Sequence, residues 1–154
     1  MASDKSSRGN ASQFFVAGEL CRRDLVAVVT MGNTPNTDIL CSNREGTKFV
    51  HIQVKTFVPG NKTVSVGRKA ERNYGANFVW VLAGIPTPAK NAEFVYFIIP
   101  SDEVSANVEE AHRKWLSEPN IRTGGERNDS KVRTIHLPPN VCYNGWSIQR
   151  ELSP

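Results

Sequence analysis

The sequence predicts an α/β fold with a central mixed β-sheet flanked by helices. Residues 11–24 and 102–116 have helical periodicity, and five short β-branched or aromatic runs lie between them. A short basic helix is expected over residues 65–74, between the third run and the fourth, and it allows a parallel crossover. The chain of 154 residues has no internal repeat, which indicates one compact domain.

The N-terminal elements are a tail and a helix. Residues 1–10 are rich in serine and charged side chains, so we expect a disordered tail before a single domain over residues 11–154. The helix over residues 11–24 carries an apolar stripe, and Glu19 lies near the edge of that stripe.

The predicted strands are short and bounded by turn-forming residues. Glycine and asparagine after the first two runs favour tight connections, and Pro100 ends the last run before the second helix. The segment 118–140 is expected to be mostly loop, with an edge strand over 131–137. The five sheet strands are expected at residues 26–30, 37–41, 48–56, 78–82 and 94–99.

Composition narrows the class of protein. The 19 Lys and Arg residues against 15 Asp and Glu give a net charge of +4, which favours polyanionic partners such as nucleic acid. The cysteines, Cys21, Cys41 and Cys142, are far apart and lack zinc-site spacing, so we expect reduced thiols. No apolar run approaches the roughly 20 residues that span a bilayer, and the polar start is not a secretion signal. These observations predict a cytoplasmic protein with no membrane partner.

The run over residues 48–56 presents two different faces. Side chains two apart on a strand share a face, so Gln53 and Lys55 point one way and Ile52 and Val54 the other. Asp38 lies on the preceding strand, where hairpin pairing places its carboxylate beside Gln53. A helix packed on that face adds the carboxylate of Glu19. These oxygen ligands suit Mg²⁺, which leaves positions for water and a phosphate oxygen.

Such a site suits phosphodiester hydrolysis. The reaction needs a deprotonated water aimed at phosphorus and positive charge near the oxygens that become negative. A bound cation supplies both, and Lys55 would stabilise the developing charge or help to orient and deprotonate the water.

Three stretches of the sequence together resemble the PD-(D/E)XK nuclease signature: residues 17–20 (AGEL), 32–40 (GNTPNTDIL) and 50–56 (VHIQVKT). That superfamily includes restriction endonucleases and archaeal Holliday-junction resolvases, and the resemblance covers roughly residues 11–100. It implies a restriction-endonuclease-like α/β sandwich, cleavage that depends on Mg²⁺ with Mn²⁺ able to substitute, and often a homodimer.

The resemblance also assigns roles to four residues. Glu19, Asp38 and Gln53 are the expected metal ligands, and Lys55 is the expected catalytic lysine. Gln53 departs from the pattern, which usually has Asp or Glu there. An amide oxygen can bind a hard cation but brings no negative charge to hold it.

Other residues allow alternative interpretations. Lys62, Arg68, Lys69 and Arg72 either contact nucleic-acid phosphates or form a solvated helix face. Trp80 belongs to an apolar run and is expected in the core.

Three functions remain open. The first is a nuclease that cuts DNA, with Asp38 and Lys55 essential. The second is a catalytically inactive nuclease-like subunit that binds nucleic acid or another protein, which Gln53 makes conceivable. The third, a purely structural partner, leaves the polar face around Lys55 unexplained.

Overall fold

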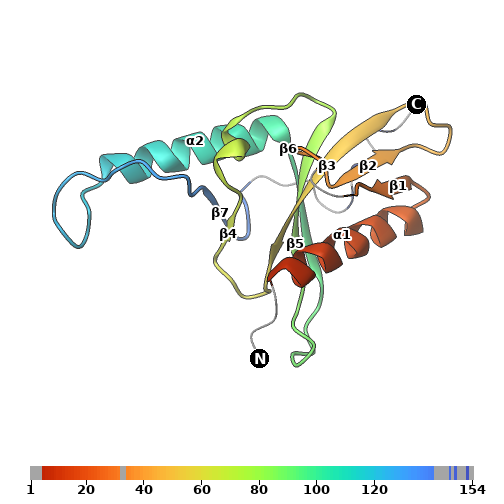
Figure 1. Ribbon diagram of the computed structural model, residues 1–154, viewed down its shortest axis with the longest axis horizontal. Helices are drawn as coiled ribbons and strands as arrows, with labels where there is room; N and C mark the ends of the chain where they lie inside the picture. The colour runs from red at the N-terminus through yellow and green to blue at the C-terminus, as the bar shows by residue number, and fades with distance from the viewer. Residues whose placement is uncertain (1–4, 32–33, 141–145, 147, 149–151, 153–154) are drawn as a thin grey trace.

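The computed structural model describes residues 5–31, 34–140, 146, 148 and 152 (Figure 1). It contains two long helices, a five-stranded sheet, a separate two-stranded ribbon and one turn of 3₁₀-helix. The elements in chain order are α1 (Lys5–Arg22), β1 (Val26–Val29), β2 (Ile39–Ser42), β3 (Phe49–Phe57), β4 (Thr63–Ser65), η1 (Arg68–Glu71), β5 (Phe78–Gly84), β6 (Val95–Pro100), α2 (Ser101–Ser117) and β7 (Thr134–His136).

The main sheet is mixed, as predicted. Its strands lie in the order β1-β2-β3-β5-β6, and the first three form an antiparallel meander. β3 and β5 are parallel and are joined by a crossover that contains β4 and η1, while β6 returns antiparallel to β5. The predicted α/β sandwich and its parallel crossover are therefore confirmed.

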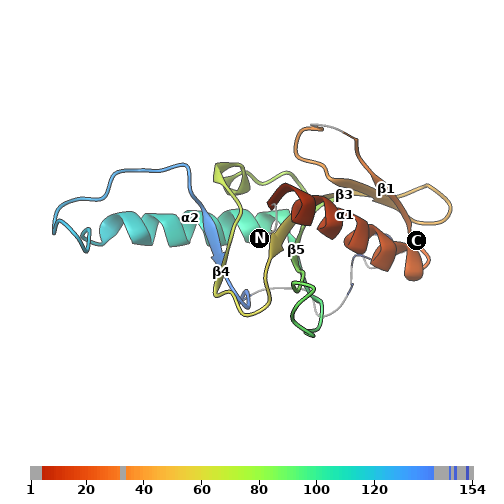
Figure 2. The same cartoon turned by 60° about the horizontal axis from the view of Figure 1, so that its bottom comes forward.

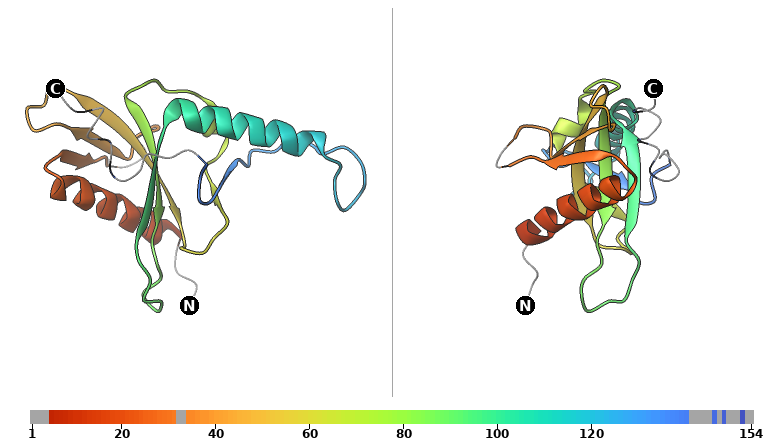
Figure 3. Two further views of the ribbon diagram at one scale, coloured as in Figure 1. Left: turned by 180° about the vertical axis from the view of Figure 1, so that it is seen from behind. Right: turned by 90° about the vertical axis from the view of Figure 1, so that its right-hand side faces the viewer.

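The two long helices cover opposite faces of this sheet (Figures 1 and 3). Helix α1 buries Val16 and Leu20 against one face, together with Ile52 of β3. The core on the other face includes Val104 and Val108 of α2 with side chains of β5. Because side chains alternate along a strand, each central strand contributes to both cores.

Helix α1 begins earlier than the sequence predicts. It starts at Lys5, so the expected disordered tail is wrong for residues 5–10, and residues 1–4 lie outside the described part of the chain. Long-range contacts hold these first turns: Ser12 Oγ hydrogen-bonds to Thr56 Oγ1 at 2.6 Å, and Arg8 Nη2 donates to the Ile85 carbonyl oxygen at 3.4 Å. Tertiary contacts of this kind override weak local propensity.

The crossover segment differs from the predicted short helix over residues 65–74. Helical geometry is limited to the single 3₁₀ turn η1, and Gly67 just before it has a φ of 78°, which no α-helix contains. Before this turn lies β4, a strand that the sequence analysis missed, and it pairs with β7. Figure 2 shows the chain after α2 returning along the helix to place β7 beside β4. The edge strand expected over 131–137 is thus confirmed in position, although it is shorter.

Two further expectations concern cysteines and membranes. Cys21 is exposed and Cys41 is buried, both as free thiols, and burial raises the pKa of Cys41 to about 12. Cys142 lies outside the described residues. Within the described ranges, neither α1 nor α2 has the length and apolar character needed to cross a bilayer.

Candidate active site

Asp38 and Gln53 lie side by side at the start of β2 and the middle of β3. The backbone N–H of Asp38 donates to the Ile52 carbonyl at 2.9 Å, which extends the antiparallel ladder by one residue. The carboxylate oxygen Oδ2 of Asp38 accepts hydrogen bonds from the Val54 backbone N–H at 2.7 Å and from Nε2 of Gln53. The cross-strand proximity predicted from the sequence is therefore confirmed.

Gln53 and Lys55 face a cavity of about 340 Å³ on the side of the sheet away from α1. The crossover supplies the opposite wall, and β5 supplies aromatic side chains. One rim residue, Asn36, has a φ of 60°, in the left-handed region that asparagine tolerates better than most residues. The cavity is lined by Asn36, Gln53, Lys55, Val66, Gly67, Lys69, Tyr74, Phe78 and Trp80.

Burial perturbs both ionisable groups on the β2–β3 side. Desolvation raises the pKa of the Asp38 carboxyl, opposed by its bond from the Val54 N–H and by the charge of Lys55. Desolvation lowers the pKa of the Lys55 ammonium, and Lys69 lowers it further while Asp38 opposes the change. Both charged forms are therefore less favourable here than in water, which is common at functional sites.

Glu19 is not brought to this cavity. It lies in the last turn of α1, where its carboxylate pairs with Arg22 at 3.0 Å and Arg23 at 3.3 Å. Hydrogen bonding and the charges of these arginines lower the pKa of Glu19. Its side chain lines a different groove, next to Phe94 and Trp146. The expected convergence of Glu19 with Asp38 is wrong, because α1 packs on the apolar face of β3 and the site lies on the other face.

Without Glu19, Asp38 and Gln53 offer a divalent cation only the small number of protein ligands that Mg²⁺ accepts. Both hydrogen bonds to Asp38 end on Oδ2, and Gln53 uses its nitrogen in one of them, so Asp38 Oδ1 and the Gln53 side-chain oxygen remain as ligands. Mg²⁺ often takes one or two carboxylates and completes its shell with water and substrate phosphate. In the described ranges, no group of three His, Cys, Asp or Glu residues is placed to hold a metal. Asp38 and Gln53 fit a weakly held cation that shares substrate oxygens.

The four basic residues expected to bind nucleic acid occupy different environments. Lys62 is an exposed loop residue, and the guanidinium of Arg72 lies over the ring of Tyr74 at 5.2 Å. Arg68 pairs with Glu71 and Asp129, both at 3.8 Å. Lys69 alone among the four lines the cavity.

Sequence reasoning did not place Asn36, Tyr74 or Trp80 at the cavity. Trp80 was expected in the core, which its burial confirms, and it lines the cavity as well. The β3–β5 register places Trp80 directly opposite Gln53. Parallel pairing across a crossover has no local sequence signal, although Asn36 lies within the turn-forming stretch that precedes Asp38.

No protein-family model and no curated protein matches this chain. Among solved structures, the chain is similar to Hjc, a Holliday junction resolvase from the archaeal hyperthermophile Archaeoglobus fulgidus. The two share 16% sequence identity over 83% of this chain and 88% of that chain, with a TM-score of 0.48.

Proposed function

We propose that the chain is a metal-dependent nuclease that hydrolyses phosphodiester bonds in DNA. The observation that carries the proposal is that Gln53 and Lys55 line one cavity while Gln53 hydrogen-bonds to the carboxylate of Asp38 beside it. A carboxylate, an amide oxygen and a lysine at that spacing combine cation ligands with a positive charge for a phosphate. The net charge of +4 favours a polyanionic substrate.

In this proposal Asp38 and Gln53 would hold Mg²⁺ or Mn²⁺, and the bound cation would lower the pKa of a water molecule and neutralise phosphate charge. Lys55 contacts a non-bridging phosphate oxygen and stabilises the charge that develops there. Burial lowers the pKa of Lys55, which makes proton exchange with the attacking water easier than for a solvated lysine. The Val54 N–H bond fixes the Asp38 carboxylate, so no reorganisation is needed when substrate arrives.

A catalytically inactive nucleic-acid-binding subunit is the second candidate. The observation that favours it is the neutral side chain of Gln53, which leaves Asp38 as the one carboxylate next to the cavity within the described ranges. With less negative charge, cation affinity is lower. This candidate predicts binding that survives chelation and no cleavage with any divalent metal.

We further propose a homodimer in the cytoplasm. Cleavage of both strands of a duplex is most simply performed by two sites related by two-fold symmetry. The spaced cysteines and the absence of zinc-site motifs are consistent with a reducing compartment.

The test is cleavage of a labelled panel containing duplex, single strand, flap, four-way junction and RNA, with Mg²⁺, Mn²⁺ or EDTA. We expect metal-dependent cutting of a DNA substrate, reduced about 100-fold or more in Lys55→Ala and in Asp38→Ala. Lys90→Ala is the matched control, because Lys90 is an exposed lysine in the loop between β5 and β6, remote from the cavity. Its activity should equal that of the wild type.

Two results would contradict the proposal. Unchanged cutting by correctly folded Lys55→Ala protein would remove Lys55 from catalysis. No cutting of any substrate by the wild type, with either metal, would favour the inactive subunit.

A further inference from the structure

The cavity contains an unsatisfied hydrogen-bond donor. The Trp80 side chain is only 2% exposed, and its indole Nε1 has no hydrogen-bond partner among the described residues. A buried N–H left unpaired costs about 1–3 kcal/mol, so such groups generally have a partner. Because Trp80 lines the cavity opposite Gln53, a ligand in the cavity is a natural partner for this N–H.

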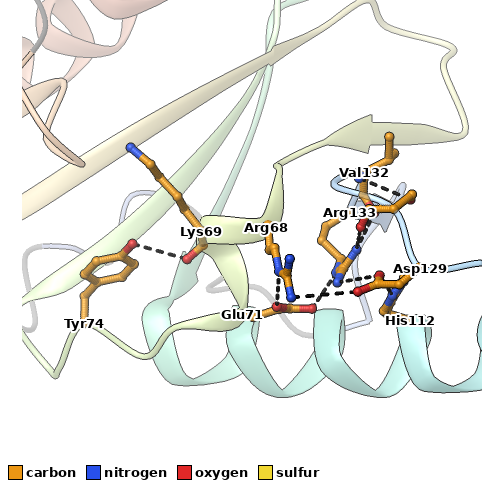
Figure 4. A network of polar contacts seen from close by, with 9 residues as sticks. Arg68, Lys69, Glu71, Tyr74, His112, Asp129, Val132 and Arg133 are labelled. Atoms are coloured by element: carbon orange, nitrogen blue, oxygen red, sulfur yellow. Dashed lines mark hydrogen bonds and ion pairs between the residues drawn. The ribbon is translucent and has the colours of Figure 1, made fainter.

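Lys69 is held at the same cavity by a rigid part of the crossover. Its neighbour Glu71 is tied to the buried guanidinium of Arg133, which connects η1 to β7. The Tyr74 hydroxyl donates to the Lys69 carbonyl oxygen at 3.2 Å. In Figure 4 the Lys69 ammonium extends away from this network, whereas Arg68 turns into it toward Glu71. The backbone of Lys69 is therefore fixed, and its charge remains available to a ligand.

Among the described residues, the only acidic or basic side chains that line the cavity are lysines. The lining contains Lys55 and Lys69 and no Asp or Glu, with Asp38 adjacent on the β2 side. Both lysine side chains line this one cavity. Two like charges in a partly buried cavity repel each other, and a bound anion relieves that repulsion. The two positive charges and the unpaired Trp80 N–H therefore favour the same class of ligand, an anion that accepts hydrogen bonds.

We propose that this cavity is an anion pocket in which Lys55, Lys69 and the Trp80 indole N–H hold a nucleic-acid phosphate without a metal ion. The inference deepens the proposed function, on which its choice of nucleic acid rests. It assigns phosphate capture to three donors on β3, η1 and β5. It also agrees with a glutamine at position 53. A neutral amide does not repel phosphate as the Asp or Glu that the PD-(D/E)XK pattern usually has there would.

The pocket sets an order of binding. The lysines hold a phosphate on their own, and Asp38 and Gln53 would then hold a divalent cation beside it. Nucleic acid therefore binds without metal, and bound metal and bound nucleic acid raise each other's affinity by the same factor.

The first experiment measures binding of a fluorescein-labelled single-stranded oligonucleotide by anisotropy in EDTA. We expect Lys69→Gln and Lys55→Gln each to weaken binding about tenfold and to reduce the slope of log affinity against log salt by about one. Lys90→Gln removes the same charge from the β5–β6 loop, which lies at the other end of the sheet from η1 (Figure 1), and should bind like the wild type. Equal binding by Lys69→Gln and Lys90→Gln would remove Lys69 from the pocket.

The second experiment observes the Trp80 indole directly, because replacing so large a buried side chain could unfold the protein. In ¹H–¹⁵N spectra recorded in EDTA, titration with the oligonucleotide or with inorganic phosphate should shift the Trp80 indole resonance. The resonances of Trp115 and Trp146, which lie elsewhere, should stay in place. A stationary Trp80 resonance at saturating oligonucleotide would overturn its assignment as a donor.

The two proposals fail in different ways. If the wild type binds no oligonucleotide in EDTA yet cuts DNA with Mg²⁺, the metal-independent pocket is wrong and the nuclease proposal stands. If it binds in EDTA through Lys69 but cuts nothing with either metal, the pocket stands and the nuclease proposal fails.

Discussion

The two faces of β3 differ in how completely they are closed. Val50, Ile52 and Val54 lie under α1, and each is buried. On the other face, Gln53 and Lys55 are only partly buried and border a cavity of about 340 Å³. Adjacent residues of one strand therefore lie in opposite environments, a closed core on one face and an open cavity on the other.

The opening on the face of β3 away from α1 is local, because the rest of that face is well packed. One step further along β3, on the same side as Lys55, Phe57 is buried and stacks on Phe97 at 6.0 Å between ring centres. The core on the face away from α1 surrounds the cavity. All residues that line the cavity lie between Asn36 and Trp80 in the sequence.

Ile52→Ala should give the largest loss of stability. Ile52 is fully buried between α1 and the sheet, and truncation leaves a void there. We expect the free energy of unfolding to fall by about 3 kcal/mol in urea titrations. Gln53→Ala, one residue away but on the open face, should cost about 1 kcal/mol or less. Equal losses in the two variants would refute the distinction between the faces.

Gly84→Ala should produce an intermediate loss by overpacking. A Cβ atom at Gly84 would lie 2.7 Å from the Phe57 ring and 3.1 Å from the Val95 carbonyl oxygen. We expect a loss of about 2 kcal/mol in the free energy of unfolding. Shortening the neighbour in the double variant Phe57→Leu/Gly84→Ala should recover part of the loss. An additive result would mean that the Phe57 ring is not the obstacle.

Asp38→Asn should change stability in a pH-dependent way. Burial raises the pKa of Asp38 above its ordinary value of 3.8 in the folded protein, so the folded state holds this proton more tightly than the unfolded chain does. That contribution is complete below the ordinary pKa and is lost as the pH rises through the folded pKa. Relative to the wild type, Asp38→Asn should therefore be more stable at neutral pH than at pH 4, by less than about 1 kcal/mol after solvent screening. Melting temperatures at both pH values measure this, and an opposite trend would contradict the raised pKa.

The sequence was sufficient to predict the parts of the site that depend on local geometry. Alternation along β3 correctly placed Gln53 and Lys55 on one face, and hairpin pairing correctly placed Asp38 beside Gln53. Both inferences use neighbours in one meander, where strand register follows from short connections.

The sequence was insufficient where distant segments meet. Lys69 and Trp80 reach the cavity through the crossover and the parallel β3–β5 register, which no local pattern specifies. The helical position of Glu19 at the edge of an apolar stripe did not determine which face of the sheet α1 would cover. The apolar side chains of β3 determined it, and they drew α1 to the face opposite the cavity.

Glu19→Gln should have the smallest effect on stability and cleavage. It distinguishes the site expected from the sequence, which includes Glu19, from the site in the structure, which does not. Glu19 is a partly exposed residue whose carboxylate pairs with Arg22 and Arg23 near the C-terminal end of α1. Exposed ion pairs contribute up to about 1 kcal/mol, and a negative charge near a helix C-terminus is itself unfavourable, so the two effects partly offset each other. We expect a change below about 0.5 kcal/mol in stability and unchanged metal-dependent cleavage, whereas Asp38→Asn should lose cleavage. Loss of cleavage in Glu19→Gln to the level of Asp38→Asn, without loss of folding, would show that α1 moves when substrate binds and returns Glu19 to the metal site.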